Sequence, residues 1–309
     1  MSALPALGQR RRVVIAVVAT LVVVFLAASI ASQLGDLRSY DWHFDPVWLV
    51  ASFVLLIAFA AAQAMLWVWL VRAVGGELAA APGVRIFSIA LLTRYVPTQI
   101  LMAVTRVTML GRLGVSRSVA IASLVYEFPL QVGSAFALSV AFLVDLPALQ
   151  DHASRWAVLA APVGLLVALH PRVIGTLSDK LAARLGGAAE HVILPVARLV
   201  PFALAYVATF VVAGLGVYAF ARSVYPATPF DLRVVSSYAI GYSASVLAFF
   251  IPGGLGARDG ATATALAAVM PGRVAVAVAL GIRLAQTLVE LGFAGAFELA
   301  HRRREARAC

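Results

Sequence analysis

The hydrophobic positions of this chain gather into long apolar segments that are separated by short charged stretches. The apolar segments lie at residues 13–35, 46–71, 118–144, 156–170, 199–221 and 274–299. A helix rises about 1.5 Å per residue, so roughly 20 apolar residues cross a hydrocarbon core about 30 Å thick. The segment 156–170 is somewhat short, and the others reach that length. The pattern predicts an all-α polytopic membrane protein with about six transmembrane helices.

Two further apolar stretches are interrupted, and we expect each to form a re-entrant or broken helical hairpin. In residues 84–112, Pro97 removes a backbone donor and breaks the helix, and Arg106 interrupts the apolar pattern. In residues 234–269 the break is the glycine-rich run that begins at Pro252. A complete extra crossing is the alternative interpretation of this second break.

The two interrupted stretches share a plan, which predicts an internal repeat. In each, a helix ends at a proline, a short helix carries an arginine, and a turn containing glycine leads into a long helix. The offset that places Arg117 on Arg273 also places Glu127 on Arg283. An odd number of predicted crossings separates the hairpins, so the repeats are inverted, an arrangement typical of transporters. The expected divisions are one membrane domain, 1–309, with repeat cores at 84–145 and 230–300.

The charged residues set the expected orientation. The chain has 24 basic and 14 acidic residues, and most basic residues fall in loops that this topology places on the cytoplasmic side. We therefore expect a multi-pass protein of the cytoplasmic (inner) membrane with both termini in the cytoplasm. Residues 172–190 form a basic cytoplasmic stretch with an amphipathic segment that is expected to lie on the membrane. A cleavable signal peptide is the alternative interpretation of residues 13–35.

Composition excludes several classes of protein. Hydrophobic residues make up 62% of the chain and charged residues 12%, whereas a soluble domain is about 45–50% apolar and about 25% charged. A soluble globule of this size cannot bury so much apolar surface. The lone cysteine is Cys309, so we expect no disulfide framework and no Cys/His metal cluster. We also expect no cofactor and no nucleic-acid partner.

A few ionisable residues lie within or beside the predicted membrane segments: Arg106, Glu127, Arg258, Asp259, Arg283 and Glu290. Placing one charge there costs roughly 2.5–3.5 kcal/mol on insertion scales, so we expect these residues to pair. Repeat symmetry puts Glu127 and Arg283 at equal depth, and we predict an intramembrane ion pair between them. The alternative is that such a pair only ties the two repeats together.

The run from Pro252 to Gly260 carries the strongest local signal of a binding site. Glycines permit unusual backbone angles and the close approach of a ligand. The helix that follows presents free N–H groups, and Arg258 adds a full positive charge, so the run is a candidate seat for a phosphate. The alternative is a tight turn in which Arg258 and Asp259 neutralise each other. The candidate glycines are Gly253, Gly254 and Gly256.

Other polar residues extend this candidate site. In the first half of the chain, Arg106 and Gln99 form the candidate counterpart of this phosphate site. Gln286 and Glu290 lie four residues apart on one face of the last helix and, with Asp259, predict a polar seam facing inward. A set of six polar residues, which includes Gln99 and Gln286, either lines a polar cavity or bonds helix to helix, as most such residues do in membrane bundles. They are Gln63, Gln99, Tyr126, Gln131, Ser134 and Gln286.

These motifs resemble those of a known family of membrane proteins. The run from Pro252 to Gly260 is similar to its Pro-Gly-Gly-hydrophobic-Gly-x-Arg-Glu-Gly signature. Its first-half signature resembles Tyr95-Val96-Pro97, Arg106, Gly114-Val115-Ser116 and Ser123-Leu124-x-x-Glu127. The family is the flippase-like-domain family, also named for the lysylphosphatidylglycerol synthase transmembrane region, and the resemblance covers nearly the whole chain. Thr98-Gln99 stands where Gly-Lys is expected, which weakens the case for a cationic binding site at that position. Asp259 replaces the usual Glu.

The resemblance implies a lipid flippase or translocator rather than an enzyme. The implied cargo is a membrane lipid with an anionic or lipid-linked head group, such as a phospholipid or a polyprenyl-linked glycan. We expect no soluble aminoacyl-transferase domain after the last helix, so the resemblance implies only the lipid-moving half of such a synthase. One alternative is a non-transporting partner of a lipid or glycan biosynthesis enzyme. The other is a membrane-embedded lipid-head transferase, for which the sequence offers no mid-membrane His and no Asp-rich metal motif.

Overall fold

The computed structural model describes residues 44–93, 100–143, 164, 171–185, 194–248 and 256–308, and these residues form helices and connecting turns without a strand. Four helices in this part are long and apolar enough to cross a membrane. They are α3 (Pro46–Ala73), α6 (Arg117–Leu143), α9 (Val196–Val224) and α12 (Gly272–Ala308). All four coincide with predicted crossings, which confirms a polytopic all-α membrane protein. The predicted crossings 13–35 and 156–170 lie outside the described residues.

Each interrupted stretch forms two short helices instead of one long helix. The first gives α4 (Ala80–Leu92) and α5 (Ile100–Gly111), and the second gives α10 (Leu232–Leu247) and α11 (Ala257–Ala267). At about 1.5 Å per residue, none of the four reaches the roughly 30 Å of a hydrocarbon core. The members of each pair pack against each other, so both stretches are broken helical hairpins. The breaks themselves, with Pro97 and Pro252, lie outside the described residues.

Local chemistry explains where several helices begin. The Asp45 carboxylate accepts hydrogen bonds from the backbone N–H groups of Val47 (2.9 Å) and Trp48 (3.4 Å), and Pro46 occupies the first turn of α3. Asp231 caps α10 in the same way through the N–H of Arg233, at 2.7 Å. Helix α11 starts differently, because its N-cap is Gly256 with a φ of 80° and no side-chain cap. That left-handed conformation favours glycine over every other residue.

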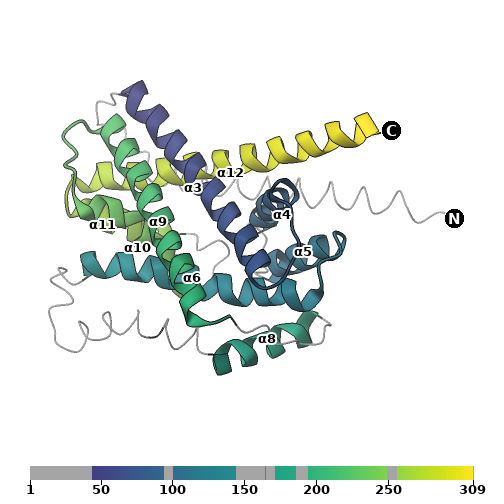
Figure 1. Ribbon diagram of the computed structural model, residues 1–309. Coiled ribbons are helices and arrows are strands. Elements are labelled where there is room, and N and C mark those ends of the chain that lie inside the picture. The colour runs from purple at the N-terminus through teal and green to yellow at the C-terminus, as the bar shows by residue number, and fades with distance from the viewer. Residues whose placement is uncertain are drawn as a thin grey trace.

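The long and short helices form two groups with the same order: α3, α4, α5, α6 and then α9, α10, α11, α12. Contacts between the groups come in matched pairs. Helix α3 packs on α9, α6 packs on α9 and α10, and α12 packs on α3 and α4. Figure 1 shows α4 and α5 on one side of the α3–α9 pair and α10 and α11 on the other, with α12 running from α11 past α4. Such an exchange of equivalent contacts is what an internal two-fold relation requires.

Glycines allow the second group to pack at close range. A Cβ added to Gly214 of α9 would clash with the backbone carbonyl of Val235 on α10. A Cβ added to Gly241 of α10 would clash with the Thr262 hydroxyl on α11. Because neither position has room for a methyl group, α9, α10 and α11 approach backbone to backbone at these points.

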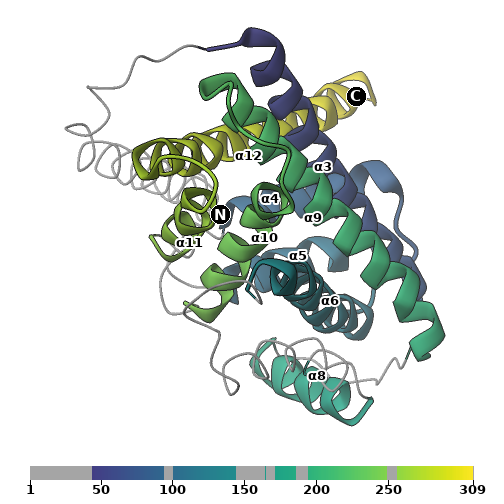
Figure 2. The same cartoon turned by 90° about the vertical axis from the view of Figure 1, so that its left-hand side faces the viewer.

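Helix α8 (Pro171–Leu185) lies within the stretch predicted to be amphipathic. It packs on α6 at the outside of the bundle (Figure 2), with Ile174 and Ser178 buried and Leu177 exposed. This alternation gives the helix one buried face, as the sequence pattern predicts. Its contact with a membrane surface stays a prediction.

Candidate functional site

The first candidate centre surrounds Arg106 in the middle of α5. The side chain is 2% exposed, and its Nη1 donates to the Glu127 carboxylate of α6. The guanidinium also lies over two aromatic rings, with its Cζ 4.5 Å from the centroid of Phe87 on α4 and 4.8 Å from that of Trp67 on α3. Four helices therefore enclose one buried ion pair, and the cation gains cation–π attraction in addition to its carboxylate.

The partner of Glu127 corrects the sequence prediction. We predicted that Glu127 pairs with Arg283, because repeat symmetry places both at one depth; the structure pairs it with Arg106 instead. Symmetry relates positions on α6 and α12, but α5 lies directly against α6 and brings its own cation. A buried carboxylate is best compensated by the cation nearest to it. Arg283 is itself buried on α12, where its backbone carbonyl accepts a hydrogen bond from the Thr287 hydroxyl at 2.9 Å.

The second candidate centre surrounds Arg258 at the start of α11. The side chain is 7% exposed, its Nη2 donates to Oε1 of Gln286 on α12 at 2.6 Å, and its Cζ lies 4.7 Å from the ring centroid of Tyr238 on α10. The amide of Gln286 in turn donates to Oε1 of Glu290 at 2.8 Å. The predicted polar seam on α12 therefore exists as a hydrogen-bonded relay that ends on Arg258. Asp259, the remaining member of the predicted seam, is half-buried beside it.

Both centres are built on one plan. In each, an arginine on the short helix lies over an aromatic ring of the helix before it and donates to a polar side chain of the long helix after it. The acceptors differ in charge. Arg106 meets a carboxylate, whereas Arg258 meets a neutral amide with a carboxylate one residue further along the relay. The positive charge of Arg258 is therefore less directly compensated than that of Arg106.

A ladder of amides and hydroxyls connects the regions of the two centres. Gln63 of α3 donates to the Thr209 hydroxyl of α9 at 3.0 Å and accepts from Gln131 of α6 at 2.7 Å. The Tyr242 hydroxyl of α10 donates to Gln131 at 2.7 Å. Gln131 lies one turn after Glu127, and Tyr242 lies one turn after Tyr238, so the ladder begins beside the first centre and ends beside the second.

Other predicted polar residues form bonds between helices or to the backbone. The Tyr126 hydroxyl accepts from the backbone N–H of Leu194 at 2.8 Å, and Ser134 donates to the carbonyl of Ala203 at 3.1 Å. These bonds match the alternative in which such residues hold helices together. The predicted site residues Gly253, Gly254 and Gln99 lie outside the described residues.

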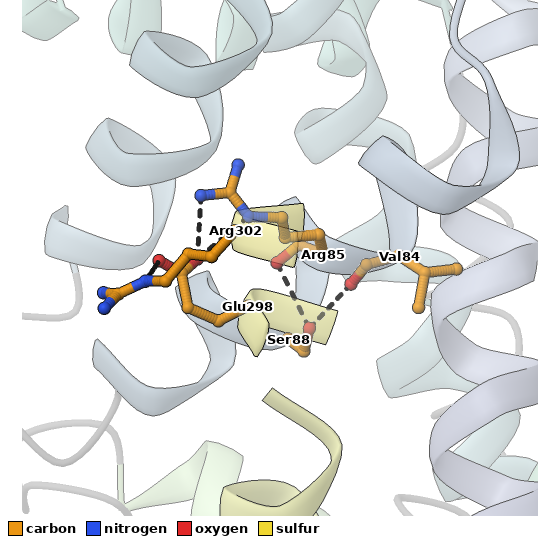
Figure 3. Close-up of polar contacts among 5 residues, drawn as sticks. All are labelled: Val84, Arg85, Ser88, Glu298 and Arg302. Atoms are coloured by element: carbon orange, nitrogen blue, oxygen red, sulfur yellow. Dashed lines mark hydrogen bonds and ion pairs between the residues drawn. The ribbon is translucent and has the colours of Figure 1, made fainter. Parts of the chain in front are cut away.

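The sequence interpretation missed a polar cluster that joins α4 to α12. Glu298 accepts on Oε2 from Nε and Nη2 of Arg85, at 2.9 and 2.8 Å, and on Oε1 from Nε of Arg302, at 3.0 Å. Figure 3 shows both arginines converging on this carboxylate, with Ser88 donating to the carbonyls of Val84 and Arg85. The spacing of Glu298 and Arg302 was a visible helical signal, but Arg85 is distant in sequence and gave none.

Over the described residues, no group of three or more His, Cys, Asp or Glu side chains is placed to hold a metal ion. The polar side chains at the two centres are arginines, carboxylates and an amide, which interact by charge and hydrogen bonds.

Comparison with known proteins covers both centres. A family model described as lysylphosphatidylglycerol synthase TM region matches residues 13–293. This range includes every helix from α3 to α11 and the part of α12 that carries Arg283, Gln286 and Glu290. No curated protein sequence matches the chain.

Proposed function

This chain belongs to the lysylphosphatidylglycerol synthase transmembrane region family, and on that premise we propose that it is a lipid translocator. Its proposed cargo is a lipid with an anionic or lipid-linked head group, which it moves across the cytoplasmic (inner) membrane. Both termini lie in the cytoplasm in this proposal. The chain binds and moves the lipid without forming a covalent bond, and a separate lipid or glycan biosynthesis enzyme supplies it.

The observation that carries the proposal is the neutral acceptor of Arg258. A phosphate that enters the bilayer interior loses its hydration and needs a cation in its place. Arg106 already shares its charge with a carboxylate, whereas the direct partner of Arg258 is the Gln286 amide. A phosphate oxygen is a stronger acceptor for a guanidinium than an amide oxygen, because the phosphate is itself charged and can accept two parallel N–H bonds. A lipid phosphate can therefore displace Gln286 from Arg258.

The start of α11 supports the same assignment. Arg258 is the second residue of the helix, and the N-cap Gly256 supplies no side chain to the free N–H groups of the first turn. Those N–H groups carry the positive end of the helix dipole. An anion beside Arg258 therefore meets a full charge and a partial charge together. Gly241 keeps α10 close to this turn, because a Cβ there would lie 2.9 Å from the Arg258 carbonyl oxygen.

The ladder between the centres supports movement rather than binding alone. Thr209, Gln63, Gln131 and Tyr242 offer donors and acceptors across four helices of both groups. A polar head group that passes between the groups can exchange its hydrogen bonds with these side chains, while its acyl tails stay in the bilayer.

The test is a transport assay on purified protein in liposomes. Fluorescent phosphatidylglycerol carries the phosphate, and fluorescent glucosylceramide is the comparison lipid without one; a membrane-impermeant quencher reports the rate at which each crosses. We expect Arg258→Gln to slow phosphatidylglycerol movement by about tenfold or more, and Arg258→Lys to keep part of the rate because it keeps the charge. Arg302→Gln is the matched control, since Arg302 is largely exposed outside the bundle interior.

The outcomes separate transport from its alternatives. Equal rates for wild type and Arg258→Gln, with both proteins folded, remove Arg258 from the mechanism. A wild-type rate equal to that of empty liposomes, for phosphatidylglycerol and for a polyprenyl-linked glycan, favours a non-transporting partner of a biosynthesis enzyme.

A further inference from the structure

Three buried hydrogen-bond donors near the first centre have no partner within the described part of the chain. They are Nε1 of Trp67, Nε of Arg106 and the hydroxyl of Tyr206, and among the described residues none of these atoms has a hydrogen-bond acceptor. The three side chains are 0%, 2% and 0% exposed. Such groups are rare in folded proteins, and each one calls for a physical explanation.

The three donors come from three helices to one place. Trp67 of α3 lies under the Arg106 guanidinium of α5, with 4.8 Å between the Cζ atom and the ring centroid. Tyr206 of α9 lies in the same buried cluster as Trp67 and as Tyr126, the residue before Glu127. These three donors therefore share one buried region with the ion pair, whereas the fourth such donor among the described residues, Nε of Arg222, lies in the last turn of α9.

The neighbouring polar groups show that this local lack of partners is unusual. Gln63, Gln131 and Tyr242 are hydrogen-bonded to one another or to Thr209, and Tyr126 is bonded to the backbone. A buried donor without an acceptor loses the free energy of its hydration and gains no hydrogen bond in exchange, because apolar surroundings contain no acceptor. We infer that acceptors from outside the polypeptide accept hydrogen bonds from these three donors.

The charge at this place selects the kind of acceptor. Arg106 and Glu127 already compensate each other, so an added anion would bring an unbalanced charge into a low-dielectric interior. We propose that Trp67, Arg106 and Tyr206 form a binding site for neutral oxygen acceptors. Water is one source of such oxygens, and the hydroxyl or ester oxygens of a lipid are the other.

The number of donors sets the minimum number of oxygen atoms that the site holds. A water or carbonyl oxygen accepts about two hydrogen bonds, so three donors need at least about two oxygen atoms. Water also has protons to donate, and the Glu127 carboxylate beside Arg106 is the acceptor for them. The site is the neutral counterpart of the cationic centre at Arg258. It follows from the donors alone and does not depend on lipid transport.

The test compares two buried tyrosines. Tyr206→Phe removes a hydroxyl that has no partner among the described residues, and Tyr126→Phe removes one that accepts from Leu194. If oxygen acceptors fill the site, both variants lose a hydrogen bond, and we expect each to lower the melting temperature of the purified protein by about 2–4 °C. If the Tyr206 hydroxyl has no acceptor, its removal raises the melting temperature while Tyr126→Phe still lowers it, and that result overturns the proposal.

A second measurement reports on the indole directly. The difference between the ultraviolet resonance Raman spectra of wild type and Trp67→Phe isolates the Trp67 indole band that responds to N–H hydrogen bonding. We expect a hydrogen-bonded indole, and a free one contradicts the proposal. Both measurements are made on delipidated protein and on protein returned to lipid. An effect present in both preparations identifies water, and an effect that requires lipid identifies a lipid oxygen.

Discussion

The surroundings of Arg106 and Arg258 differ in how each arginine is compensated. Both side chains extend from a short helix, lie over an aromatic ring and donate to the following long helix. Arg106 is bonded to a carboxylate and has a second aromatic ring, Trp67, within reach. Arg258 is bonded to an amide, and the carboxylate of Glu290 lies one hydrogen bond further away.

In the proposed function, this difference separates a structural role for Arg106 from a binding role for Arg258. An ion pair that is complete within the protein holds its helices together and offers little charge to a ligand. A cation held by a neutral acceptor is less stabilising, but it keeps its attraction for an anion. In the proposed function, the same local plan therefore stabilises the first group of helices and keeps a charge for a ligand in the second, where the glycine-rich signature also lies.

Removing the carboxylate of the first centre should have the largest effect. Glu127→Gln leaves Arg106 buried without its counter-charge, and breaking a buried pair in this way costs about 3–5 kcal/mol. We expect that loss in the free energy of unfolding, measured by denaturant titration in detergent. The double variant Arg106→Met, Glu127→Leu removes both charges and should recover most of it. A loss below about 1 kcal/mol for Glu127→Gln would show that the pair does not fasten the first group.

Crowding the second centre should have the next largest effect. Gly241→Ala forces a methyl group against Thr262 and the Arg258 carbonyl, and overpacking of this kind costs about 1–3 kcal/mol. Because the methyl group separates α10 from α11, we also expect slower lipid transport. Gly260→Ala is the matched control, since its Cβ meets nothing within 4 Å and alanine favours the helix by up to about 1 kcal/mol. Equal stabilities for the two variants would contradict the close packing at Gly241.

Neutralising Arg258 should cost less stability than opening the first centre. Arg258→Gln loses one hydrogen bond between a charged donor and a neutral amide, a net contribution of about 1.5–3 kcal/mol. Arg106→Gln, by contrast, leaves the Glu127 carboxylate buried alone, and we expect it to cost as much as Glu127→Gln. Thermal unfolding of the two arginine variants side by side measures the contrast. If Arg258→Gln is as damaging as Arg106→Gln, the two centres have the same role.

The surface cluster at Glu298 should show the smallest effect. Arg85 and Glu298 are 22% and 24% exposed, and exposed ion pairs contribute about 0.2–1 kcal/mol. We expect Glu298→Gln to lower stability within that range at low salt and by less in about 1 M salt, where charges are screened. A loss of stability that is large and independent of salt would show that this α4–α12 contact behaves like the buried pair at Arg106 and not like an exposed ion pair.

Hydropathy predicted the spanning helices because each is long and apolar, and Pro97 and Pro252 predicted the two breaks because proline cannot continue a helix. The partners of the buried charges required the three-dimensional packing. Arg106 and Glu127 were both singled out from the sequence, but the rotation of α5 against α6 decides that they meet. The unpartnered donors of Trp67 and Tyr206 left no trace in the sequence, because an apolar segment looks the same whether or not a ring nitrogen or hydroxyl finds an acceptor.

The matched contacts between the two helix groups also bear on how the protein unfolds. Helix α6 packs on α10, and α12 packs on α4, so the last helix of each group packs against a short helix of the other group. Separating the groups breaks both of these interfaces, together with the α3–α9 contact, in a single event. Neither group can open first and leave the other intact, and the described helices should therefore melt as one cooperative unit with a single transition.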